Sequence, residues 1–154
     1  MKRLLAAGLV AVQLLLIAAL VLIPNGTLWP LSPAVLTVGI LLGIAGLVIA
    51  ILGVLGLGPA LTASPIPRDR APLVTGGPYG WVRHPIYSGI LLGGIGLVLL
   101  GASVWHLVLW LGLFVLLAIK TRWEERMLLD EHPDYREYAA DVGRFLPGVG
   151  KLHQ

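Results

Sequence analysis

Charged residues are scarce in this 154-residue chain, and cysteine is absent. Asp, Glu, Lys and Arg make up 12% of the sequence, whereas hydrophobic residues make up 57%. A soluble domain of this length cannot bury so much apolar surface, because its surface-to-volume ratio is too high. The absence of cysteine excludes disulfides, thiolate nucleophiles and Cys-ligated metals. The composition therefore excludes a disordered chain and a basic nucleic-acid-binding domain, and predicts an integral membrane protein.

Two long stretches, residues 4–67 and 84–119, contain no charged side chain. The first begins with the apolar run 4–23, whose length suits one helical crossing of a bilayer. This run exceeds a signal-peptide core and lacks a convincing small-x-small cleavage site at its end, so we expect it to be retained. Ser32 and Pro33 form a helix-start pair, and from them we expect a second span to about Leu57.

The second uncharged stretch predicts a helical hairpin. We expect a third span over 86–100, a tight turn at 101–103 and a fourth span over 104–119. In the second span, small residues recur every three or four positions and form one stripe, which predicts close packing on another helix of this chain. The residues of this stripe are Gly39, Gly43, Gly46, Ala50 and Gly53. Gln13, inside the first span, is interpreted as an interhelical hydrogen-bonding residue.

The basic residues give the expected orientation. Loops 24–32 and 101–104 have no Lys or Arg, and all eleven basic residues fall on the other side: Lys2, Arg3, Arg68, Arg70, Arg83, Lys120, Arg122, Arg126, Arg136, Arg144 and Lys151. By the positive-inside rule, both termini and the loop 58–85 are predicted to be cytoplasmic. The small, Cys-free, four-span form suggests a prokaryotic cytoplasmic membrane.

We therefore expect an all-α integral membrane protein of one domain, residues 1–154, with about four transmembrane helices. The parts are the first two spans (1–57), a cytoplasmic loop (58–85), a helical hairpin (86–119) and a cytoplasmic tail (120–154). In the tail, the apolar positions of Tyr135, Tyr138, Ala139 and Val142 share one face of a short amphipathic helix. Gly143 is a suitable terminator for that helix.

The hairpin should bring two polar segments together. Arg83, His84 and Pro85 open the third span, Glu124 and Glu125 follow the fourth, and a hairpin returns its ends to one membrane face. Taken alone, the basic pair could be an interfacial anchor and the two glutamates a solvated charged helix. The histidines have no metal-ligand spacing, so no metal site is expected.

Taken together, these segments resemble the isoprenylcysteine carboxyl methyltransferase family and the related phospholipid N-methyltransferases. The resemblance extends from Gly76 to Pro147. It consists of the motifs G-P-Y, R-H-P-x-Y-x-G, E-E, Y-x-x-Y and R-x-x-P, all of which are present in order. The first two spans match only as generic hydrophobic helices.

The resemblance implies that the chain uses S-adenosylmethionine, with the loop and the C-terminal amphipathic helix forming the cofactor site. It also implies an acceptor drawn from the bilayer: a lipophilic small molecule, a lipid or a prenylcysteine-like group. Membrane lipids are then expected partners and nucleic acids are not, while the oligomeric state stays open. The residues expected to bind the cofactor are Gly77, Pro78, Tyr79, His84, Pro85, Tyr87, Gly89 and Glu125.

The expected roles depend on the acceptor. The residues expected to be catalytic are Arg83, Glu124 and Arg144. A carboxylate nucleophile needs only a cation to hold it, for which Arg83 or Arg144 is suited. An amine must lose a proton, for which Glu124 or His84 is suited. Carboxyl O-methylation is the leading hypothesis. The alternatives are N-methylation of a phospholipid or another lipid amine, and a small membrane protein that binds or transports without catalysis.

Overall fold

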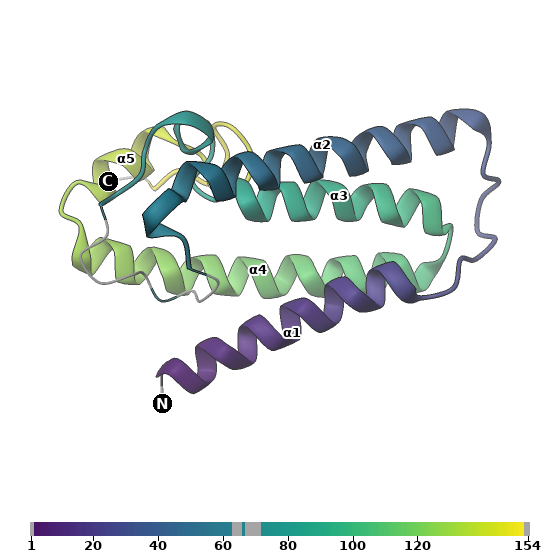
Figure 1. Cartoon of the computed structure of the whole chain (residues 1–154), viewed down its shortest axis with the longest axis horizontal. Coiled ribbons are helices and arrows are strands. Elements are labelled where there is room, and N and C mark those ends of the chain that lie inside the picture. Colours follow the sequence, from purple (N-terminus) through teal and green to yellow (C-terminus); the bar gives the residue numbers. More distant parts are fainter. Residues whose placement is uncertain (1, 63–65, 67–71, 153–154) are drawn as a thin grey trace.

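The computed structural model describes residues 2–62, 66 and 72–152. Within these ranges the chain is helical and has no β-strand. The elements are α1 (Lys2–Leu22), α2 (Pro33–Leu57), η1 (Gly58–Ala60), η2 (Gly77–Gly80), α3 (Pro85–Gly101), α4 (Val104–Glu131) and α5 (Tyr135–Asp141), where η denotes a short 3-10 helix. Helices α1 to α4 run along the long axis of the molecule, and α5 lies at one end of it (Figure 1).

Helices α1, α2 and α4 are long and apolar enough to cross a membrane. The predicted third span is α3, a shorter apolar helix of 17 residues, below the roughly 20 that a perpendicular crossing needs. The all-α membrane architecture is thus confirmed. Both chain ends lie at the same end of the bundle as α5 and the beginning of α3 (Figure 1).

Local sequence determines the helix ends. Ser32 caps α2, where its side chain accepts a hydrogen bond from the backbone N–H of Val35 at 3.4 Å, and Pro33 occupies the first helical position. The turn between α3 and α4 is as tight as predicted: Ala102 adopts a left-handed conformation, with φ of 43°, and Ser103 caps α4. The charged helix after the fourth span is part of α4 itself.

The glycine stripe of α2 packs on α3 within the chain. Gly39, Gly46 and Gly53 are buried, and α2 makes its most extensive contact with α3. Gly89 and Gly96 of α3 approach the backbone of α2 so closely that a methyl group on either would overlap main-chain atoms. The predicted internal packing is confirmed, and it fixes the position of the first turn of α3.

The segment between α2 and α3 contains only η1 and η2 as regular elements among its described residues, in agreement with the predicted irregular loop. Arg68 and Arg70, which were used to predict the orientation, lie outside the described residues. In the tail, α5 buries Tyr135 and Ala139, which confirms the amphipathic face. Gly143 follows α5 as predicted, but its φ is not positive. A Cβ at this position would overlap main-chain atoms, the nearest being the carbonyl oxygen of Leu146, and this contact requires glycine.

Candidate functional site

A cavity of about 400 Å³ lies at the end of the bundle where α3 begins. This volume falls within the roughly 300–1,000 Å³ of ordinary small-molecule sites. The polar and aromatic side chains of its wall are Gln13, Thr62, Tyr79, Arg83, His84, Tyr87, Lys120, Glu124, His132, Tyr135 and Tyr138. The aliphatic part includes Val10 and Leu14 of α1 and Val54 and Leu57 of α2. The cavity therefore adjoins both the polar end of the molecule and its membrane-spanning helices.

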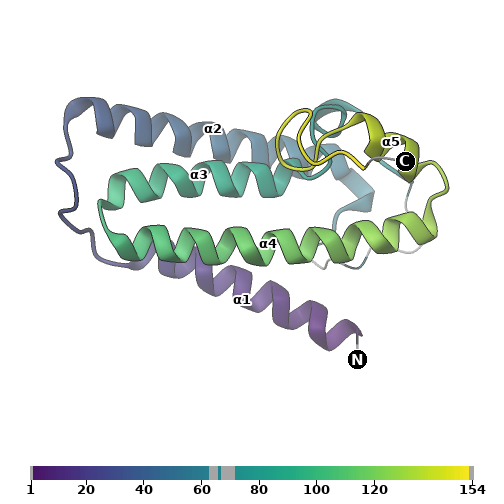
Figure 2. The same ribbon diagram turned by 180° about the vertical axis from the view of Figure 1, so that it is seen from behind.

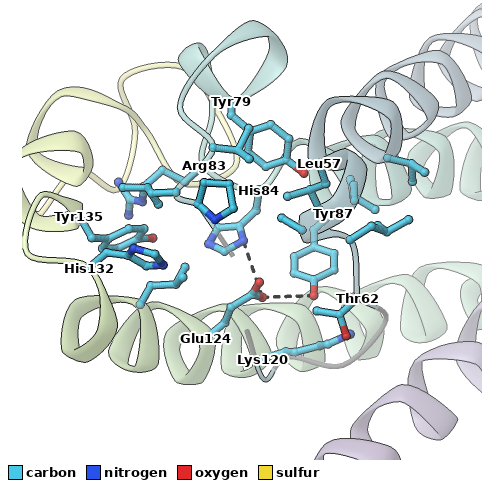
Figure 3. A pocket seen from close by; sticks show the side chains of 18 of the residues that line it. Leu57, Thr62, Tyr79, Arg83, His84, Tyr87, Lys120, Glu124, His132 and Tyr135 are labelled. Carbon is cyan, nitrogen blue, oxygen red and sulfur yellow. Dashed lines mark hydrogen bonds and ion pairs between the residues drawn. The ribbon is translucent and has the colours of Figure 1, made fainter. Parts of the chain in front are cut away.

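The hairpin brings the two motif segments into direct contact, as the sequence predicted. His84 lies between the two glutamates, with Nε2 at 3.2 Å from Glu125 Oε1 and Nδ1 at 4.0 Å from Glu124 Oε2. The hydroxyl of Tyr87 donates to Glu124 Oε2 at 3.3 Å, and its ring stacks on the His84 imidazole. Figure 3 shows Glu124 joined to both side chains at the floor of the cavity. These contacts fix the Glu124 carboxylate where it can meet a ligand.

Arg83 is buried and uses all five of its N–H donors within the protein. Nε and Nη2 donate to Glu125 Oε1 at 3.0 and 2.8 Å, and Nη2 also donates to the carbonyl of Gly150 at 2.9 Å. Nη1 donates to the carbonyls of Ala139, at 3.0 Å, and Val142. A guanidinium has no sixth donor. Although Arg83 borders the cavity, its contacts are those of a clamp joining α3, α4, α5 and the C-terminal segment, and none is left for a substrate carboxylate.

Glu125 is the common acceptor of a buried charge cluster. Its side chain is 5% exposed and accepts from Arg83, His84 and Arg144. Arg144 donates through Nε to both carboxylate oxygens at 3.1 Å and through Nη2 to Oε2 at 2.6 Å. A buried carboxylate is tolerated when cations and hydrogen bonds compensate for lost hydration. Glu125 and Arg144 therefore hold the site together from behind the cavity wall.

The C-terminal segment covers the first turn of α3. The backbone N–H groups of Arg83 and His84 donate to the carbonyls of Gly143 and Arg144 at 2.8 and 3.2 Å. The Ser88 hydroxyl donates to the carbonyl of Phe145 at 2.7 Å. Figure 2 shows this segment, in yellow, lying beside the beginning of α3. It closes the polar end of the site with main-chain hydrogen bonds.

The structure separates the residues singled out from the sequence into two groups. Those on the cavity wall are Tyr79, Arg83, His84, Tyr87 and Glu124. Those that do not line it are Gly77, Pro78, Pro85, Gly89, Glu125 and Arg144. Pro85 is the buried first residue of α3, and Gly89 packs against α2. Their contacts explain the motif positions by helix initiation and close packing, without a ligand.

Sequence reasoning missed two parts of the wall. Lys120 is 1% exposed, donates to Gln13 Oε1 at 2.8 Å and places its ammonium 5.1 Å from the centre of the Tyr87 ring. This bond confirms the predicted interhelical role of Gln13. Because Lys120 precedes Glu124 by four residues, helical periodicity could have placed them on one face.

The tail supplies the second part, through His132, Tyr135 and Tyr138. The resemblance placed the C-terminal amphipathic helix at the cofactor site but did not identify these residues. The Tyr138 hydroxyl donates to the carbonyl of Tyr79 at 2.5 Å, which attaches α5 to η2. Burial raises the pKa of Tyr138 to about 12 and that of Tyr135 well above its ordinary value. Both hydroxyls are therefore protonated at neutral pH and can donate hydrogen bonds. In the sequence, the Y-x-x-Y motif was the signal that could have identified Tyr135 and Tyr138 as site residues.

Three known proteins are similar to this chain. The cobalt-zinc-cadmium resistance protein CzcN of Cupriavidus metallidurans is 35% identical over 120 residues, which are 75% of this chain and 50% of that protein. The nickel-cobalt-cadmium resistance protein NccN of Alcaligenes xylosoxydans xylosoxydans is 31% identical over 142 residues, 90% of this chain and 62% of its own length. An uncharacterized protein of Schizosaccharomyces pombe is 34% identical over 83 residues, 50% of this chain and 24% of its length. The chain thus spans less than two thirds of each relative.

The family model of the phospholipid methyltransferases matches residues 34–133. The matched range contains α2, η2, α3 and α4, and with them the Arg83–Gly89 and Glu124–Glu125 motifs. The match confirms the resemblance drawn from these motifs and includes every helix of the cavity except α1 and α5. The chain belongs to the phospholipid methyltransferase family.

Proposed function

We propose that this protein transfers a methyl group from S-adenosylmethionine to a lipophilic acceptor at the cytoplasmic face of a membrane, and that the acceptor group is a carboxylate. The observation that carries the proposal is the composition of the cavity wall. One part is polar and aromatic, and the other is aliphatic and includes side chains of α1 and α2. Such a wall suits a polar cofactor and an apolar acceptor held side by side. Membership of the family supports the same reaction class.

The residues on the wall fit the methyl donor. When bound, S-adenosylmethionine supplies an activated methyl group on a sulfonium. The faces of Tyr79 and Tyr87 suit a cation or a flat adenine. His84 and the hydroxyl of Tyr135 suit its polar groups. Glu125, which was expected to hold the cofactor directly, instead fixes His84 from behind.

The cavity also offers residues for the acceptor. A carboxylate acceptor requires a cation, and Lys120 provides one in the wall beside the aliphatic residues of α1. Arg144 does not line the cavity and is engaged with Glu125, and Arg83 has no donor left. Alignment of the two ligands contributes most of the rate in such a displacement, and a carboxylate needs no base. Glu124 would be the base in the alternative reaction, N-methylation of a lipid amine.

The location is part of the proposal. Both termini lie at the end of the bundle where α3 begins (Figure 1), and the residues that line the cavity include those around the beginning of α3. The sequence assigns the basic residues to this end. The positive-inside rule makes that end cytoplasmic, in a prokaryotic membrane. A site there can take the cofactor from the cytosol and the acceptor from the bilayer.

Two measurements on the detergent-solubilised protein test this function. Titration calorimetry with S-adenosylhomocysteine should give saturable binding, and His84→Ala should abolish it. Labelled-methyl transfer onto a lipid extract, with a prenylcysteine analogue in parallel, should give a labelled methyl ester of a carboxyl group. Mild base should release the label from this ester. Wild-type protein that neither binds the cofactor product nor labels any lipid would overturn the proposal.

Glu124→Gln distinguishes the carboxylate acceptor from the amine. The change keeps the side chain's size but removes its charge and its basicity. With a carboxylate acceptor we expect kcat to stay within about tenfold of the wild type, since no proton is removed. A base that is needed contributes about 10²-fold or more. Steady-state kinetics showing a loss of that size would favour the lipid amine.

Two relatives are named as metal-resistance proteins, which raises a different function, direct metal binding. Among the described residues there is no cluster of three or more His, Cys, Asp or Glu side chains able to hold a metal ion. The aromatic cavity gives methyl transfer the stronger support. The non-enzymatic alternative of a binding or transport protein is tested by the same labelling experiment.

A further inference from the structure

Tyr135 carries a hydroxyl for which the fold provides no partner. It is the first residue of α5, its side chain is 1% exposed, and its oxygen makes no hydrogen bond within the described part of the chain. Buried hydroxyls are almost always paired, because burying one without a partner forfeits its hydration. An unpaired buried hydroxyl on a cavity wall therefore indicates a group that arrives with a ligand.

Tyr138 provides an internal comparison. It lies on the same helix and the same cavity wall, and its ring meets that of Tyr135 edge-on with centroids 5.8 Å apart. Its hydroxyl is paired with the carbonyl of Tyr79. The fold thus satisfies one tyrosine of the Y-x-x-Y motif and leaves the other unsatisfied. Burial alone does not explain the difference, since the partnered tyrosine is the more exposed of the two.

The position of Tyr135 indicates which ligand it meets. In Figure 3, Tyr135 and His132 lie on one side of His84, while Tyr87 and Lys120 lie on the other. The aliphatic residues of α1 adjoin the Lys120 side, because Gln13 of α1 is bonded to Lys120. The lipophilic methyl acceptor is thereby assigned to the Lys120 side of the cavity, and the Tyr135 side is left to the polar ligand, the methyl donor.

We infer that the Tyr135 hydroxyl donates a hydrogen bond to an oxygen or nitrogen acceptor of the methyl donor and so contributes to cofactor affinity; this rests on the proposed function. A tyrosine hydroxyl is protonated at neutral pH because its ordinary pKa is about 10, and burial raises the pKa of Tyr135 further. It is a neutral hydrogen-bond donor, and it matches the hydrogen-bond acceptor atoms on the carboxylate, ribose or adenine of S-adenosylmethionine. Its role is cofactor binding, distinct from the role of base that Glu124 would have with an amine acceptor.

Tyr135→Phe tests the inference, because it removes only the unpaired oxygen. Calorimetry with S-adenosylhomocysteine should show a Kd raised about five- to tenfold, the loss of one neutral hydrogen bond. Without ligand, the thermal midpoint should be unchanged or higher, because the variant no longer buries an unpaired hydroxyl. Tyr138→Phe, the matched variant, should lower the ligand-free midpoint, because it breaks the bond to Tyr79.

Three results would overturn the inference. Equal affinity of Tyr135→Phe and wild type for S-adenosylhomocysteine would mean that water satisfies the hydroxyl. Unchanged affinity with a raised KM for the lipid acceptor would assign Tyr135 to the acceptor. A wild-type protein that does not bind S-adenosylhomocysteine would remove the proposed function itself, and it is distinguished from the first two results by the wild-type titration alone.

Discussion

Arg83→Lys is expected to lower the free energy of unfolding by about 2–5 kcal/mol, because it leaves about two buried acceptors without a hydrogen bond at about 1–3 kcal/mol each. A lysine ammonium has three donors on one nitrogen and cannot reproduce a planar fork of five. It would leave carbonyls of α5 and the C-terminal segment, or an oxygen of Glu125, without a partner. Because those carbonyls hold the tail against α3, cofactor binding should be lost together with stability.

Thermal unfolding in detergent measures this effect, and limited proteolysis shows whether the tail detaches first. Arg144→Lys is the matched control. The Arg144 side chain is 21% exposed and, among the residues that the structure describes, pairs only with Glu125, so we expect less than half the loss of stability. An Arg83→Lys protein as stable as the wild type, or destabilised no more than the Arg144 variant, would contradict the clamp.

Gly46→Ala is expected to destabilise the helical bundle by about 3 kcal/mol, the upper part of the range for overpacking. A Cβ at Gly46 would lie 2.5 Å from the carbonyl oxygen of Gly89 and 2.7 Å from Cα of Gly93. These are main-chain atoms that cannot rotate away, so α2 and α3 must separate. Separation would also displace Leu57 of the cavity wall and weaken cofactor binding.

Gly43→Ala provides the control for this prediction. Gly43 lies on the same helix, but a Cβ there would meet no atom within 4 Å. Both substitutions gain the same helix propensity, up to about 1 kcal/mol, so the difference between them isolates the contact with α3. Thermal unfolding of the two variants should therefore shift in opposite directions. Equal stability would refute close packing at Gly46.

Much of the fold could be predicted because its determinants are local. Uncharged runs of about 20 residues predict spans, and the Ser32–Pro33 pair and the turn at 101–103 set helix ends that the structure confirms. The length of α3 was also evident, since the apolar run is short. The same turn predicted that Arg83 and His84 would meet Glu124 and Glu125, because a hairpin returns its ends to one side.

The division of roles inside that cluster could not be predicted. Neighbouring helical positions point about 100° apart, so Glu124 faces the cavity while Glu125 faces Arg83 and Arg144. The sequence does not specify the rotation of α4 about its axis. That rotation is set by packing of α4 on α1 and α3 and by the fold of the C-terminal segment over α3.

The sequence by itself determined the membrane class, the helix boundaries, the meeting of the two motifs and the resemblance to a family. These follow from composition, period and order along the chain. Tertiary structure alone decided that Arg83 is a saturated clamp, that Lys120 reaches the cavity and that Tyr135 has an unpaired hydroxyl. The physical reason is that donor saturation and burial depend on atoms from distant segments, which no local pattern specifies.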